Sequence, residues 1–300
     1  MIRGLIVTLL CMLGDAQGTP LPARLGETGL ADRDVVAFEP QFPLWSDGAG
    51  KHRWIKLPSG SAVDARQTDA WEFPPGTKLW KEFGFDRPIE TRMIERLPDG
   101  SWRFATYVWN AAGTEAELAP AEGLRGLSLA SAPNGRYAIP SRADCLACHD
   151  GPAVPVLGFS AVQLAPKLPD LARRGMVKNL PPPLVAAPPR IAPALGYLHG
   201  NCGHCHNEAG AVAGIDLIFA HRAADSAASA QRTVQSLFGR DSRFRAPGVA
   251  SVHRENVVLQ RKSSTNPYSR MPPLGVSIVD RDGLALVEQW IRQTAKETSP

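Results

Sequence analysis

The sequence predicts an α+β protein, with an antiparallel β-sandwich or barrel-like domain over residues 35–142 and a mainly helical domain over residues 191–300. Three observations carry this prediction. Short stretches of alternating apolar and polar residues, separated by Gly and Pro turns, fill the first region. Residues 152–193 then carry ten prolines, which excludes a long helix there. Near the C-terminus, apolar residues repeat at helical spacing.

The β region shows its clearest pattern in a predicted hairpin. Residues 89–97 and 101–109 alternate in polarity on either side of the turn Pro98-Asp99-Gly100. Further strands are predicted over residues 52–57 and 77–85. Six of the seven tryptophans lie in this region, where core packing is the expected role for most of them.

The C-terminal region is predicted to begin and end with a helix. Residues 191–199 form the first helix, and Asp280 caps the last one. The apolar stripe of this last helix consists of Leu284, Val287, Trp290 and Ile291. Between the two regions, residues 143–190 are expected to form a Pro-rich connector that wraps the surface in extended conformation. One short helix fits within it, over residues 169–174.

Residues 1–18 have the features of a cleavable secretory signal peptide. Arg3 supplies a positive charge, residues 5–13 form a short apolar core, and Ala16-Gln17-Gly18 is a small-x-small cleavage site. This apolar run is too short to span a bilayer, and no other segment is long and apolar enough. The sequence therefore predicts a periplasmic protein whose mature chain has no membrane span.

Composition bounds the classes of partner. The formal net charge is +4, the basic residues are dispersed, and no nucleic-acid recognition motif is present. Nucleic acid is therefore not an expected partner. A hydrophobic content of 44% is enough for a substantial core.

Two five-residue motifs carry the chemistry: Cys145-Leu146-Ala147-Cys148-His149 and Cys202-Gly203-His204-Cys205-His206. Each is a C-x-x-C-H, the signal for covalent attachment of a c-type haem. Cysteines three residues apart lie on the same side of a helical segment, so each thiol can reach one vinyl group of a porphyrin. His149 and His206 would then be the proximal iron ligands. We expect two covalently bound haem c groups.

Two other chemistries use paired cysteines. The four residues Cys145, Cys148, Cys202 and Cys205 could form a zinc site or two disulfides. Neither alternative explains a histidine directly after both pairs. The predicted export signal also favours haem, because bacterial c-type haems are attached in the periplasm.

Met271 is the predicted distal ligand of the second haem. It lies 65 residues after His206, and Pro272-Pro273 would stiffen the loop that presents its sulfur. His/Met ligation raises the reduction potential, and a six-coordinate iron favours electron transfer. For the first haem the sequence leaves three candidates open, with His253 and His221 behind them: Met176, His199 and His52.

The order of elements over residues 191–300 is that of a small class I cytochrome c: helix, C-x-x-C-H, long loop, Met-Pro and terminal helix. In such a domain the haem itself supplies much of the core that a short segment lacks. We therefore expect the second haem in a cytochrome c-like domain, and the first in the segment over residues 143–190.

Outside the haem motifs, the chain resembles a family of largely uncharacterised bacterial dihaem c-type cytochromes. The matching stretches are Phe42-Pro43-Leu44-Trp45-Ser46-Asp47-Gly48-Ala49, Phe73-Pro74-Pro75-Gly76-Thr77, Ile89-Glu90-Thr91-Arg92, Tyr107-Val108-Trp109-Asn110 and Met271-Pro272-Pro273-Leu274-Gly275. The resemblance implies a β-rich N-terminal region joined to a haem-binding C-terminal half. It implies no substrate.

The leading functional hypothesis is a periplasmic electron carrier between a donor dehydrogenase or membrane donor and a downstream acceptor, with redox proteins as partners. One alternative is a dihaem peroxidase-like enzyme with one open haem. It is weakened because no distal acid or arginine can be singled out. A second alternative is a haem-based redox sensor or binding module. The sequence favours electron transfer over catalysis and assigns no catalytic residue.

Overall fold

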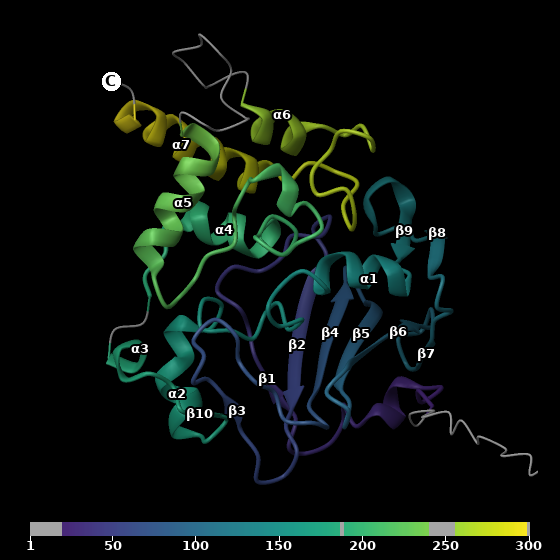
Figure 1. Cartoon of the computed structure of the whole chain (residues 1–300). Helices are drawn as coiled ribbons and strands as arrows, with labels where there is room; N and C mark the ends of the chain where they lie inside the picture. Colours follow the sequence, from purple (N-terminus) through teal and green to yellow (C-terminus); the bar gives the residue numbers. More distant parts are fainter. Residues whose placement is uncertain (1–19, 187–188, 240–255, 299–300) are drawn as a thin grey trace, which may run out of the picture.

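The computed structural model describes residues 20–186, 189–239 and 256–298. Its centre is a six-stranded antiparallel sheet in the order β1-β2-β4-β5-β6-β7 (Figure 1). These strands are β1 Val36–Ala37, β2 Gly50–Lys56, β4 Lys78–Gly84, β5 Pro88–Arg96, β6 Trp102–Trp109 and β7 Ala116–Leu118. The predicted antiparallel sheet is confirmed. In the described part of the chain this sheet stays open, with β1 and β7 at its edges, so the barrel-like alternative of the prediction is wrong.

Two further sheets of the described residues have two strands each. β3 (Val63–Asp64) pairs in parallel with β10 (Val177–Lys178), and β8 (Leu124–Ser128) pairs with β9 (Arg136–Ile139). The parallel pair joins a strand of the β region to the Pro-rich connector. The predicted hairpin is confirmed: β5 and β6 pair from Glu90 opposite Val108 to Arg96 opposite Trp102. Gly100 closes its turn with φ of 86°, which glycine adopts without strain.

Strand pairing divides the side chains of the large sheet between two faces, because alternate residues of a strand point to opposite sides. We call one of them the α1 face, since it carries the side chains nearest helix α1 (Arg142–His149). Its members on the four long strands include Lys51, Arg53, Ile55, Leu79, Lys81, Phe83, Glu90, Arg92, Ile94, Phe104 and Thr106. The opposite face includes His52, Trp54, Trp80, Met93 and Tyr107.

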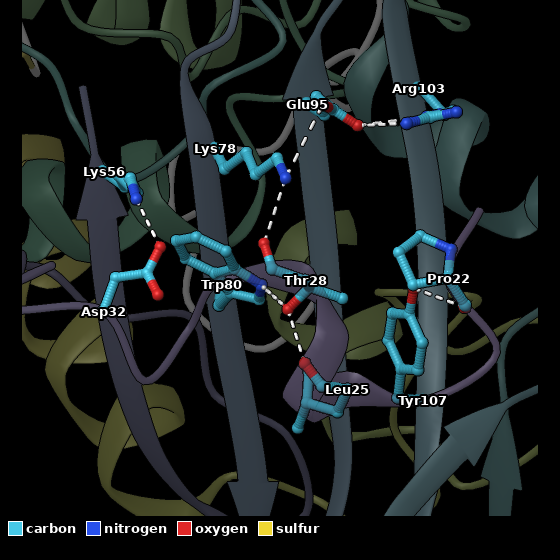
Figure 2. A network of polar contacts seen from close by, with 10 residues as sticks. All are labelled: Pro22, Leu25, Thr28, Asp32, Lys56, Lys78, Trp80, Glu95, Arg103 and Tyr107. Atoms are coloured by element: carbon cyan, nitrogen blue, oxygen red, sulfur yellow. Dashed lines mark hydrogen bonds and ion pairs between the residues drawn. The ribbon is translucent and has the colours of Figure 1, made fainter. Parts of the chain in front are cut away.

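The N-terminal segment covers the opposite face (Figure 2). It includes the short 3-10 helix η1 (Leu25–Thr28). Trp80 donates its indole N–H to Thr28 Oγ1 at 3.1 Å, and Tyr107 donates its hydroxyl to the Pro22 carbonyl at 3.1 Å. Both rings are almost fully buried, so each buried polar atom has its partner.

The Pro-rich connector forms part of the main core instead of wrapping the surface. Its buried members include Val156, Phe159, Val162, Leu164, Leu168, Leu171, Met176 and Leu184, which pack on Ile55 and Leu79 of the α1 face. Helix α2 (Leu168–Arg173) lies within one residue of its predicted bounds, and α3 (Pro182–Ala186) follows. Phe159 packs edge-on against the rings of Phe38, Trp71 and Phe73. The many prolines of this connector therefore belong to short turns of a buried segment.

Four helices gather at one end of the sheet (Figure 1). They are α4 Pro193–Asn201, α5 Ser226–Phe238, α6 Val257–Ser263 and α7 Arg281–Thr298. The first and last confirm the predicted helices, and Asp280 Oδ1 accepts the Gly283 N–H at 2.9 Å as an N-cap does. Val287 and Ile291 are fully buried against Leu198 and Leu237. No helix in the described ranges combines the length and the apolar character that crossing a bilayer requires.

Residues 42–47 join the sheet to this helical group. Phe42 lies against two glycines of α4, and Trp45 donates its backbone N–H to Asn201 Oδ1 at 2.7 Å. The Asp47 carboxylate accepts the backbone N–H groups of Ser277 at 2.8 Å and Ile278 at 3.1 Å. This short stretch therefore holds both α4 and the loop that follows Met271.

Candidate haem-attachment site

The first cysteine motif lies on α1. Ser141 caps this helix: its hydroxyl accepts the Asp144 N–H at 3.1 Å, and the Asp144 carboxylate accepts the Ser141 N–H at 2.9 Å. This capping box starts the helix directly after Pro140. Within it, Cys145, Cys148 and His149 follow at helical spacing, so their side chains share one side of α1.

His149 is held between α1 and the sheet. Its Nδ1 lies 2.5 Å from the Pro155 carbonyl oxygen, and its ring centroid lies 5.3 Å from that of Phe104. Burial lowers the pKa of His149 to about 4, although the Pro155 carbonyl opposes this shift. A carbonyl partner fixes the proton on Nδ1 and leaves the Nε2 lone pair free, which is the form that ligates a metal.

The second motif follows α4 directly. Cys202 and Gly203 both donate their backbone N–H groups to the Leu198 carbonyl, and the His206 carbonyl accepts from Phe219 at 2.9 Å. The His206 ring lies 5.3 Å from the Phe219 ring. Burial lowers its pKa, against the opposing effect of the Leu217 carbonyl, although Nδ1 reaches no hydrogen bond of good geometry there.

The structure brings the two motifs together. The ligand atoms of Cys148, His204 and Cys205 all lie within 4.8 Å of one another. A hydrogen bond with Cys205, together with burial, raises the pKa of Cys148 to about 12. The same hydrogen bond lowers the pKa of Cys205. All four motif cysteines are free thiols. Because only two of them enter this cluster, a zinc site made of all four cysteines is not assembled among the described residues.

A cavity of about 970 Å³ lies beside the two motifs. It is lined by residues that follow the first motif, by His204 of the second, and by the rings of Trp71 and Phe159. Cofactor-sized ligands occupy cavities of this order. Thiol pairs on helical spacing and an imidazole with a fixed tautomer suit a covalently attached haem. The cavity itself adjoins the motifs, because none of the four cysteines, His149 or His206 is among its lining residues.

Met271 lies on the loop between α6 and α7. Its N–H donates to the Arg261 carbonyl at 2.9 Å, and it lines a cavity of about 20 Å³ together with Trp45, Tyr197 and Lys262. Tyr197 belongs to α4, the helix that leads into Cys202. Met271 therefore lies near the helix that enters the second motif. Its role as distal ligand stays a prediction.

The three candidates for the first haem lie apart from one another. Met176 is buried in the main core, directly before the connector strand β10, whose Val177 pairs with Val63. His52 belongs to the opposite face of the sheet, beside Trp54. His199 lines the large cavity, but its Nδ1 accepts the His221 N–H at 3.0 Å. The proton is then on Nε2, which leaves no lone pair there for iron. His253, a further candidate, lies outside the described residues.

We expect His199 to make stability depend on pH. Burial, with His221 and His204 adding to it, lowers its pKa from 6.5 to about 4 in the folded chain. Between these values the unfolded chain binds a proton that the folded chain does not, so stability falls as pH falls. The loss should reach about 3 kcal/mol between pH 6.5 and 4, at about 1.4 kcal/mol per pH unit. Below that pH it should level off.

The measurement is urea unfolding at a series of pH values, on the wild type and on His199→Asn. Asparagine keeps an acceptor for the His221 N–H, so its stability should vary less with pH. His52→Asn, an exposed change on the opposite face, is the control. Parallel curves for wild type and His199→Asn would contradict the expectation.

A cluster on the α1 face was not assigned chemistry from the sequence. Glu90 is fully buried and accepts both Arg92 and the Tyr137 hydroxyl, at 2.5 and 2.6 Å. Arg92 also lies 4.2 Å from the centroid of the Phe83 ring. The available signal was the alternation in Ile89-Glu90-Thr91-Arg92, where charged residues take the places that apolar residues hold elsewhere in the strand.

Three comparisons were made with known proteins. Protein-family models, curated proteins and solved structures were each searched with the whole chain. None of the three gives a match.

Proposed function

We propose that the protein is a periplasmic dihaem c-type cytochrome that carries electrons between a donor dehydrogenase or membrane donor and a downstream acceptor. Cys145 and Cys148 would attach the first haem, and Cys202 and Cys205 the second. His149 and His206 would be the proximal ligands. The family that the chain resembles, the export signal and redox proteins as partners belong to the same proposal.

The approach of the two motifs is the observation that supports this proposal best. Cys148 and Cys205 are 57 residues apart in the sequence, yet their sulfurs lie within 4.8 Å. Each would carry a thioether to a different porphyrin, so the two porphyrins would be attached side by side. An electron that enters at one of them would reach the other over a short distance. A pair of neighbouring redox centres suits a relay between two partner proteins.

The test is maturation in a host with and without the c-type haem attachment machinery. With the machinery, the mass of the exported chain should rise by two haems, and the pyridine haemochrome spectrum should give two haems per chain. Cys148→Ser and Cys205→Ser should each weaken attachment at their own motif only. If the matured chain gains no haem and instead binds zinc, the cluster of Cys148, His204 and Cys205 is a metal site and the proposal fails.

Met271→Ala should change one haem only. His/Met ligation raises the potential, so loss of the sulfur should lower one of the two midpoint potentials and remove the methionine–iron charge-transfer band. Spectroelectrochemical titration measures both effects. Met93→Ala is the matched control, because it removes a buried methionine on the opposite face of the sheet that is no candidate ligand. An unchanged band in Met271→Ala would remove this residue from the ligand set.

A second candidate function is a dihaem peroxidase-like enzyme with an open first haem. It is favoured by one observation: His199, the candidate that lines the large cavity, uses its Nδ1 to accept the His221 backbone N–H. Cyanide binding to half of the haems, together with peroxide turnover, would support this function. If both haems are low-spin and bind no added ligand, electron transfer is the function that stands.

A further inference from the structure

The α1 face of the sheet holds a cluster of four basic side chains. Lys51, Arg53, Lys81 and Arg92 stand on three neighbouring strands, and Arg53, Lys81 and Arg92 are directly opposite one another in the β2-β4-β5 register. Three of the cations surround one ring: Arg92 lies 4.2 Å, Lys81 4.8 Å and Lys51 5.8 Å from the Phe83 centroid. Like charges directly opposite one another in a sheet destabilise it unless something neutralises them.

The carboxylates nearby neutralise this cluster only in part. Glu90 is bound by Arg92 and Tyr137. Asp47 accepts the backbone N–H groups of Ser277 and Ile278, and its charge only partly opposes the lowering of the Lys51 pKa. Within the described residues, Arg53 and Lys81 form no ion pair and donate no side-chain hydrogen bond.

Because these cations are buried, the lack of a counter-charge destabilises the folded chain. Arg53 is only 7% exposed, and Lys51, Lys81 and Arg92 are partly buried. Burial, with the neighbouring cations adding to it, lowers the pKa of Lys51 to about 8 and that of Lys81 well below its usual value. Burial also lowers the pKa of Arg53 to about 10, even though Glu39 opposes the shift. A buried cation that stays charged needs an anionic partner.

The first cysteine motif lies directly over this cluster. The Arg92 charge acts on Cys145, and Lys81 and Arg92 act on His149. The His149 ring contacts Phe104, which belongs to the same face of the sheet. A group bound to Cys145, Cys148 and His149 therefore sits against the basic side chains.

We propose that Lys51, Arg53, Lys81 and Arg92 form a carboxylate seat that binds the propionates of the porphyrin attached at Cys145 and Cys148. This inference rests on the proposed function. Two carboxylates would supply the missing negative charge, and the charge-assisted hydrogen bonds of guanidinium and ammonium groups suit them. The seat would orient the first porphyrin and raise its potential, because nearby cations stabilise the reduced iron.

The experiment uses the matured full chain and two variants, Arg53→Gln and Lys81→Gln. Haem content is measured first, and then both midpoint potentials. One potential should fall by at least a tenfold change in the reduction equilibrium constant, which is 59 mV for one electron. The other should stay. Lys178→Gln removes an equal charge from an exposed site on β10 and should move neither potential.

Thermal unfolding supplies a second readout. The shift in melting temperature caused by Arg53→Gln should have opposite signs in the chain without haem and in the matured chain. In the chain produced without haem attachment, Arg53→Gln removes an unpaired buried charge and should raise the melting temperature. In the matured chain the same variant removes a partner of the propionates and should lower it. This reversal does not depend on activity.

The outcomes separate the two proposals. If the chain gains no haem, the proposed function fails and this inference fails with it. If both haems attach but the potentials do not move and the melting temperature shows no reversal, the inference alone is overturned. If succinate stabilises the matured wild type but not Arg53→Gln, the seat binds a soluble dicarboxylate, which also overturns the assignment to propionates.

Discussion

Glu90→Gln should lower the free energy of unfolding by about 3 kcal/mol, because breaking a buried ion pair leaves its partner uncompensated. Glu90 is fully buried, and it accepts both Arg92 and the Tyr137 hydroxyl. Glutamine keeps the size of the side chain but removes its charge. Arg92 would then face Lys81 and Arg53 without a bound counter-charge on the α1 face. The Glu90 carboxylate also accounts for the raised pKa of Arg92, which burial alone would lower.

Urea unfolding of the haem-free full chain measures this effect, because no propionate is present there to compensate. Tyr137→Phe removes one hydrogen bond to the same carboxylate and should cost about 1 kcal/mol. Glu288→Gln is the control: it breaks an exposed i,i+4 pair with Arg292 and should cost less than about 0.5 kcal/mol. A Glu90→Gln variant as stable as Glu288→Gln would show that the cluster is solvated and not held by its ion pair.

The sequence predicts the large sheet well where its pattern is local. Alternation and a Pro-Asp-Gly turn determine the β5–β6 hairpin, and an apolar stripe with Asp280 as cap determines α7. The barrel-like alternative was wrong because the edge strands β1 and β7, which closure would have to join, are only two and three residues long. Such strands leave almost no periodic signal.

Helices α5 and α6 were missed for a related reason. The α5 segment is rich in Ala and Ser, and its large apolar residues are confined to its C-terminal half. Only Asp225 marks its start, by accepting the Ala228 N–H at 2.9 Å. The connector was expected on the surface because ten prolines suggest an extended chain. Its leucines and Phe159 instead pack on the sheet, since apolar burial outweighs the irregular backbone.

The candidate site likewise has features that the sequence predicts and features that only the fold shows. The two motifs could be identified from spacing alone, because the chemistry is local to five residues. Their approach to one another could not, because Cys148 and Cys205 meet only after the sheet and the connector have folded. The basic cluster of the α1 face also depends on strand register, which sets Arg53, Lys81 and Arg92 side by side. No single strand shows it.

Gly200→Ala should destabilise the folded chain by roughly 2 kcal/mol. A Cβ at this position would lie 2.3 Å from the Phe42 carbonyl oxygen, which belongs to the backbone and has little room to move. Overpacking of this kind costs about 3 kcal/mol at the upper end, and the better helix propensity of alanine returns up to about 1 kcal/mol. Gly196, one turn earlier, lies against the Phe42 ring in the same way.

The control is Gly214→Ala, since no atom lies within 4 Å of a Cβ built there. Its stability should stay within about 0.5 kcal/mol of the wild type. If the second haem is attached as proposed, Gly200→Ala should also disturb it, because α4 carries Asn201 and leads directly into Cys202. Residues 42–47 hold α4 on one side and the Met271 loop on the other. A shift of Phe42 should therefore displace both α4, which leads towards His206, and the loop of Met271. These are the two predicted ligands of the second iron. Equal stability of the Gly200→Ala and Gly214→Ala variants would show that the contact between Phe42 and α4 is loosely packed.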